Sequence, residues 1–178
     1  MFQDIIQFWF EEIDSKKWWS VDPEFDQLIH SRFHSVMLQA AAGELYEWRT
    51  DDHGRLAEII VLDQFSRNVY RNTPQAFAQD AMALALAQEA IRAQADQGLT
   101  PIERNFLYMP FMHSESRAIH VYAEKLFHEH APQGNYEFEL KHKRIIDRFG
   151  RYPHRNAILG RESTPEEIEF LKEAGSSF

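Results

Sequence analysis

Apolar residues recur at three- and four-residue spacing along most of the chain, and this spacing constrains the fold most strongly. Near the start, Phe2, Ile5, Ile6, Trp9 and Ile13 share one face of a predicted helix. Four further starts have a capping residue followed by proline, which fits the first helical position. These starts are Asp22-Pro23, Thr73-Pro74, Thr100-Pro101 and Thr164-Pro165.

The remaining helices follow from the same spacing and from glycines that can end a helix. We expect helices from Pro23 to about Gly43, from Asp51 or Asp52 through Asp63, and from Pro74 through Ile91 to about Gly98. Others are expected at about 115–130 and 135–149. No apolar run alternates with period two, so no sheet is expected. The prediction is an all-α protein, one domain over residues 1–178, built as an antiparallel array of helical hairpins in a tetratricopeptide-like superhelix.

The absence of cysteine limits the chemistry of the chain. It excludes thiolate catalysis, disulfides and cysteine-ligated zinc, and it fits a reducing compartment. The first residues lack a basic segment and a cleavage site, so no signal peptide is expected. The longest uncharged stretch of small apolar residues, Ala81 to Ala87, is far too short to cross a bilayer. These features predict a cytoplasmic protein that does not contact membranes.

Charge is distributed unevenly along the chain. The net charge of −9 argues against nucleic-acid binding, which depends on a surplus of Lys and Arg. Residues 1–60 carry twelve acids and five bases, whereas residues 141–161 carry seven bases and one acid. The basic segment predicts a local site for an anion. The alternative is that its arginines form ordinary ion pairs with the acidic N-terminal helices.

The first polar cluster lies in the stretch from Leu62 to Arg71. Asp63, Arg67 and Asn68, with Gln64 beside them, fall on adjacent rows of one helical face. They can present a carboxylate, a guanidinium and two amides to one ligand. The alternative is a surface pair between Asp63 and Arg67, worth a few tenths of a kcal/mol.

The second cluster follows Pro110, which removes a helical hydrogen bond and so kinks or ends its helix. His113, Ser114 and Glu115 are therefore expected at a junction where side chains converge. A neutral imidazole there can act as a base, as a metal ligand or as a hydrogen-bonded core residue. Ser114 or Glu115 can instead cap the next helix.

The third cluster lies between Arg148 and Arg161, where arginines alternate with aromatic and aliphatic residues. Guanidinium groups bind phosphate or carboxylate through two parallel hydrogen bonds. We expect a ligand to contact this segment, whereas a solvated run of charge is the alternative. The candidate residues are Arg151, His154, Arg155 and Asn156, together with His142 before them.

These motifs together resemble the bacterial domain-of-unknown-function family 924, over essentially the whole chain. The resemblance rests on Gln7-Phe8-Trp9-Phe10, Gly43-Glu44-Leu45, the stretch from Leu62 to Arg71, Pro74-Gln75-Ala76-Phe77, Glu103-Arg104 to Glu115, and Arg148 to Glu167. It implies an all-helical, tetratricopeptide-like fold and no established activity. Ser66 departs from the family's proline, and residues 116–120 depart from its acidic pattern. The shared polar positions are Asp63, Gln64, Arg67, Asn68, His113, Ser114, Glu115, His142, Arg151, His154, Arg155 and Asn156.

Two kinds of function fit these residues, and a scaffold that binds a protein helix is a third. A binding module would hold a small anion or a peptide carboxylate, without cofactor or metal. An enzyme, a hydrolase or transferase on a phosphorylated or carboxylated metabolite, would use His113, Glu115 or His154 as catalytic groups. His120, Glu124 and His128 share a helical face, which is interpreted as solvated rather than as a metal site. The sequence predicts one cavity lined by Asp63, Arg67, His113, Glu115, Arg151, His154 and Arg155. It leaves the oligomeric state open.

Overall fold

The computed structural model describes residues 1–177, and every regular element among them is a helix. The all-helical prediction is therefore confirmed. None of these helices is both long and apolar enough to cross a membrane. The α-helices are α1 Phe2–Gln7, α2 Pro23–Ala41, α3 Asp52–Ile60, α4 Ser66–Val69, α5 Asp80–Arg92, α6 Pro101–Met112, α7 Arg117–His130, α8 Gln133–Phe149 and α9 Pro165–Phe170.

The expected capping residues begin several of these helices. The Asp22 carboxylate accepts hydrogen bonds from the amides of Glu24 and Phe25, so α2 begins at Pro23. Thr100 and Thr164 each form a capping box with the glutamate three residues later. The helix predicted to run without interruption from Pro74 is wrong, because a 3-10 turn, Pro74–Phe77, precedes α5. Gln94, with a positive φ of 59°, follows α5 and turns the chain.

The π-helical turn Val61–Phe65 joins α3 to α4, and all five of its residues are buried. A π turn adds a residue to a helical turn, so it rotates the following side chains relative to regular α-helical spacing. Such turns occur often at functional sites. Here the π turn places Asp63 and Gln64 inside the protein although both are polar.

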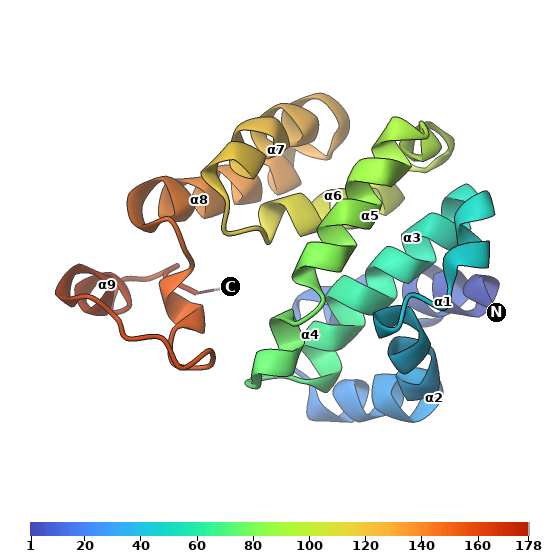
Figure 1. Ribbon diagram of the computed structural model, residues 1–178, viewed down its shortest axis with the longest axis horizontal. Helices are drawn as coiled ribbons and strands as arrows, with labels where there is room; N and C mark the ends of the chain where they lie inside the picture. The colour runs from blue at the N-terminus through green and yellow to red at the C-terminus, as the bar shows by residue number, and fades with distance from the viewer. Residues whose placement is uncertain (178) are drawn as a thin grey trace.

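The main core is formed by the N-terminal helices and by α3, α5, α6 and α7 (Figure 1). A second, smaller core lies between α8 and α9 and contains Ile145, Ile146, Tyr152 and Phe170. The segment between α8 and α9 folds back toward the start of α5, since Arg155 contacts Asp80. This return brings residues far apart in sequence to one place.

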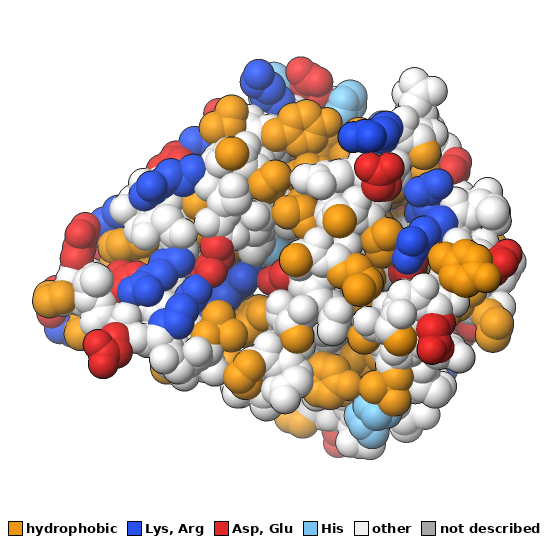
Figure 2. All heavy atoms as spheres, in the orientation of Figure 1, with side chains coloured by type: hydrophobic (Ala, Val, Ile, Leu, Met, Phe, Trp, Pro, Cys, Tyr) orange, Lys and Arg blue, Asp and Glu red, His pale blue; other side chains and the backbone are white. Residues whose placement is uncertain are grey.

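Basic side chains gather on the part of the surface that carries α8 and α9, with acidic side chains between them (Figure 2). The acids nearest to these arginines come from the middle and end of the chain. Arg148 binds Glu166, Arg151 binds Glu167, and Arg161 binds Glu115. The alternative interpretation, pairing with the acidic N-terminal helices, is therefore wrong for these three arginines.

Candidate functional site

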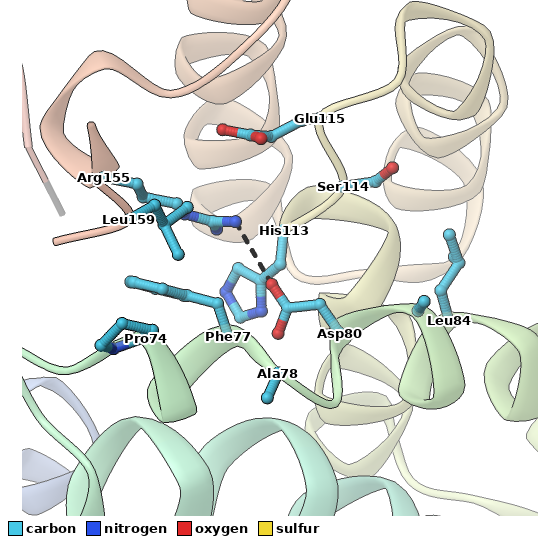
Figure 3. A pocket seen from close by; sticks show the side chains of 11 residues that line it. Pro74, Phe77, Ala78, Asp80, Leu84, His113, Ser114, Glu115, Arg155 and Leu159 are labelled. Atoms are coloured by element: carbon cyan, nitrogen blue, oxygen red, sulfur yellow. Dashed lines mark hydrogen bonds and ion pairs between the residues drawn. The ribbon is translucent and has the colours of Figure 1, made fainter. Parts of the chain in front are cut away.

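A cavity of about 390 Å³ lies where the start of α5, the junction between α6 and α7, and the C-terminal segment meet (Figure 3). Pro110 lies inside α6, and the helix ends two residues later at Met112, so His113 does begin the expected junction. Apolar side chains form much of the wall, and charged groups occupy one side. The lining residues are Pro74, Phe77, Ala78, Asp80, Ala81, Leu84, His113, Ser114, Glu115, Arg155 and Leu159.

Asp63 lies behind the cavity wall and is fully buried on the π turn. Its Oδ1 atom is 2.7 Å from His113 Nδ1 and 3.0 Å from Arg67 Nη1. Its Oδ2 atom accepts a hydrogen bond of 2.5 Å from Gln64 Nε2. Burial raises the pKa of Asp63, but the Arg67 charge and the hydrogen-bonded contacts with His113 and Gln64 outweigh burial, so the pKa lies below its usual value. Asp63 is therefore a buried carboxylate rather than half of a surface pair.

His113 connects this buried carboxylate to the cavity. Burial and the Arg67 charge lower the pKa of His113, although Asp63 acts in the opposite direction. We take the imidazole as neutral at pH 7, because its net pKa shift is downward. The contact with Asp63 then assigns the proton to Nδ1, which leaves Nε2 with a lone pair. Nε2 makes no hydrogen bond within residues 1–177, and His113 lines the cavity.

Asp80 lies between two arginines. Its carboxylate accepts hydrogen bonds from Arg67 Nη1 and Nη2, at 2.9 and 3.0 Å, and from Arg155 Nη1, at 3.2 Å. Figure 3 shows the contact between Arg155 and Asp80 beside the His113 ring. Sequence reasoning missed Asp80, although the family motif containing Phe77 ends only three residues before it.

Arg155 is buried, and its guanidinium lies between two aromatic rings. The guanidinium carbon is 4.6 Å from the ring centroid of Phe77 and 4.6 Å from that of Tyr152. A guanidinium has five N–H donors. Within residues 1–177, the guanidinium of Arg155 donates its hydrogen bond to Asp80, and the buried Nε atom of Arg155 has no hydrogen-bond partner. Burial and the Arg67 charge lower the pKa of Arg155.

Glu115 lines the cavity but holds the C-terminal segment in place. Its two oxygens accept hydrogen bonds from Arg161, at 2.6 and 2.9 Å, and one of them also accepts the Tyr152 amide. Burial raises the pKa of Glu115, but the hydrogen bonds from Arg161 and the Tyr152 amide, together with the charges of Arg161 and Arg155, outweigh burial, so the pKa lies below its usual value. Glu115 is thus an ionised, fully paired carboxylate. Ser114 also lines the cavity, and its Oγ accepts the Ser116 amide at 3.2 Å.

The other predicted site residues lie outside the cavity wall. The side-chain amide of Asn68 donates to the carboxylate of Asp26, which lies on α2, and the guanidinium of Arg71 donates to the same carboxylate. Arg151 binds Glu167 on α9 and does not line the cavity. Asp63, Arg67 and His154 do not line it either, so the predicted shared cavity is right for His113, Glu115 and Arg155 and wrong for the other four residues. Asn156 donates to Ser163 and Glu167 in the same region.

Two histidines near Tyr152 are kept neutral by burial. The pKa of His142 falls to about 3, chiefly through burial, and its Nδ1 donates to the Phe138 carbonyl. The pKa of His154 falls to about 4 for the same main reason. Neither histidine lines the cavity, although the rings of both lie within 6 Å of the Tyr152 ring.

His120 is fully buried, so its assignment to a solvated face was wrong. Its Nδ1 is 2.7 Å from Glu139, and its Nε2 is 2.8 Å from the Ser114 carbonyl. The side chain therefore supports the junction that carries Ser114. Within residues 1–177, no group of three or more His, Asp or Glu side chains is arranged to hold a metal ion.

Comparison with known proteins places these residues in a family. The family model described as "Bacterial protein of unknown function (DUF924)" matches residues 5–175. The chain belongs to this family. A solved structure, that of the protein of unknown function ATU0120 from Agrobacterium tumefaciens, has a TM-score of 0.92 and 39% sequence identity. The match covers 97% of each chain. No curated protein matches the chain.

Proposed function

We propose that this DUF924 protein binds a small organic acid in the cavity, with Arg155 holding the acid's carboxylate. The observation that carries the proposal is a buried guanidinium at the cavity wall, which lies between the Phe77 and Tyr152 rings. Its Nε–H group has no hydrogen-bond partner within residues 1–177. A buried cation without full hydrogen bonding is costly, and a bound anion offsets that cost. The cavity volume lies within the range of small-molecule sites.

The charges around Arg155 favour one negative charge on the ligand over two. The Asp80 and Glu115 carboxylates line the same cavity and repel additional negative charge. A carboxylate carries one charge and a phosphate monoester carries between one and two at pH 7. The apolar wall formed by Pro74, Phe77 and Leu84 suits a hydrocarbon body attached to the carboxylate.

The fold supports binding because it brings three separate segments to one cavity. Helices α5, α6, α7 and α8 each pack against the next along the chain. We infer that these helices form successive antiparallel hairpins of the tetratricopeptide-like kind. Such arrays present concave surfaces for ligands.

Isothermal titration calorimetry with hexanoate and with inorganic phosphate tests the proposal. We expect hexanoate to bind more tightly than phosphate, and Arg155→Gln to weaken hexanoate binding at least about 10-fold, equivalent to about 1.4 kcal/mol. Arg148→Gln is the matched control, since Arg148 pairs with Glu166 on the surface. Equal binding of hexanoate to wild type and Arg155→Gln would contradict the proposal. The absence of hexanoate binding to folded wild-type protein would contradict it too.

A further inference from the structure

We propose that Asp63 and His113 form a proton-accepting pair, and that His113 is the general base in hydrolysis of a carboxylic ester whose free carboxylate Arg155 holds. The inference rests on the proposed function, because it uses the same cavity and the same arginine. It adds a reaction to a binding site.

Asp63 has the features of a residue that orients a histidine. It is fully buried, its position is set by the π turn, and it contacts three side chains besides its own helix backbone. Arg67 and Gln64 each hold one of its oxygens, and His113 shares the oxygen held by Arg67. A carboxylate held in this way fixes the ring orientation and the tautomer of the imidazole. It also stabilises the imidazolium that forms when Nε2 accepts a proton.

His113 is the best placed of the three predicted catalytic groups. Glu115 is already bound by Arg161 and by the Tyr152 amide. His154 does not line the cavity. His113 lines it, makes its side-chain hydrogen bond through Nδ1 and leaves Nε2 available. The charged groups that act on its ring are Asp63, Arg67 and Asp80.

The proposed reaction needs water and no other co-reactant. His113 Nε2 takes one proton from water while the water oxygen bonds to the ester carbonyl carbon, whose π electrons move to the carbonyl oxygen. When the carbonyl re-forms, the bond from carbon to the alkoxy oxygen breaks, and the leaving oxygen receives the proton from Nε2. The products are a carboxylic acid and an alcohol, and the imidazole returns to its neutral state. General-base assistance of this kind contributes typically about 10²- to 10⁴-fold in rate.

Nitrogen-15 NMR of the histidine rings tests the pair without a substrate. We expect His113 to carry its proton on Nδ1 in the wild type at pH 7.5. In Asp63→Ala, no acceptor faces Nδ1, so the proton should no longer be held on Nδ1 and a substantial share should appear on Nε2; Arg67 keeps its partner Asp80 in this variant. A wild-type His113 protonated on Nε2, or a tautomer unaffected by Asp63→Ala in the folded protein, would overturn the orienting role of Asp63.

A charged ester tests the reaction. The probe is mono-(4-nitrophenyl) adipate, whose free carboxylate is too far from the ester to form a five- or six-membered cyclic anhydride, and the neutral comparison is 4-nitrophenyl hexanoate. We expect the protein to hydrolyse the charged ester at least about 10-fold faster than the neutral one, and His113→Asn to lower kcat at least about 100-fold. The asparagine amide can retain the hydrogen bond to Asp63. His130→Asn, at an exposed position, is the control and should retain the wild-type rate.

The outcomes separate this inference from the proposed function. Binding of the matching 4-nitroanilide of adipic acid, measured by calorimetry, reports on the cavity alone. If the anilide binds but the ester is not hydrolysed above the rate in buffer, the general-base role is overturned and the binding proposal stands. Equal kcat in wild type and His113→Asn overturns the role as well. If the anilide does not bind, the proposed function itself fails.

Discussion

Arg155 Nη1 donates to Asp80 Oδ2 over 3.2 Å, joining two residues that lie 75 positions apart in the sequence. The same carboxylate is held by Arg67 from α4. Asp80 therefore connects the buried cluster around Asp63 to the C-terminal segment. It also occupies donors that a bound acid would use, because it lines the cavity beside Arg155.

This position predicts opposite effects of Asp80→Asn on binding and on stability. Loss of the negative charge should tighten hexanoate binding about 3- to 10-fold, because a repulsive group and a competing partner of Arg155 are removed. The free energy of unfolding should fall by about 2 kcal/mol, because Arg67 and Arg155 lose a charged partner. Calorimetry and urea denaturation measure the two effects. Asp147→Asn, on the surface beside Lys143, should change neither; weaker binding by Asp80→Asn would contradict the assigned role.

Phe77 should contribute to binding by holding the guanidinium flat. Replacing it with leucine keeps an apolar wall but removes one of the two rings that contact Arg155. A cation–π contact is worth about 0.5–1 kcal/mol or more. We therefore expect Phe77→Leu to weaken hexanoate binding about 2- to 5-fold in calorimetry. Phe138→Leu is the control, since Phe138 is exposed and contacts Lys141. Unchanged affinity in Phe77→Leu would show that the ring does not position Arg155.

His142 should make stability depend on pH. Its folded-state pKa of about 3 lies below the unfolded value of 6.5, so the unfolded chain binds a proton first as the pH falls. Stability is thus complete above about pH 6.5 and is lost progressively down to about pH 3. Between pH 6 and pH 4, this one group contributes a slope of about 1.4 kcal/mol per pH unit.

The variant His142→Asn should remove that contribution from the slope, while its amide can retain the bond to the Phe138 carbonyl. Urea denaturation at pH 6, 5 and 4 measures the slope in each protein. His130→Asn, at an exposed position, should retain the wild-type slope. A slope unchanged in His142→Asn would mean that this histidine is protonated in the folded state.

Much of the fold follows from local sequence features. Capping residues and prolines predict where α2, α6 and α9 begin, because these side chains act on amides two or three residues away. The π turn does not follow from such features. It depends on burial of Val61–Phe65 against neighbouring helices, which apolar periodicity does not specify.

The candidate site was predictable in part. Mixed charged and apolar residues identify Asp63, His113 and Arg155 as groups near the core, where each needs a partner. The choice of partner is a tertiary property. Arg151 and Arg155 are four positions apart and of the same residue type, yet one binds Glu167 on α9 and the other Asp80 at the cavity. Asn68 similarly binds Asp26, because the π turn and α4 direct it away from Asp63.

The most direct test of the binding site is a crystal of the wild-type protein soaked with 6-bromohexanoate, in which anomalous scattering locates the bromine. The proposal predicts a carboxylate oxygen within about 3 Å of an Arg155 guanidinium nitrogen, which is ordinary hydrogen-bond distance. It also predicts the bromine against the apolar wall that includes Leu84 and Phe77. A carboxylate bound elsewhere, or a cavity left without the acid at concentrations well above its measured Kd, would contradict the proposal.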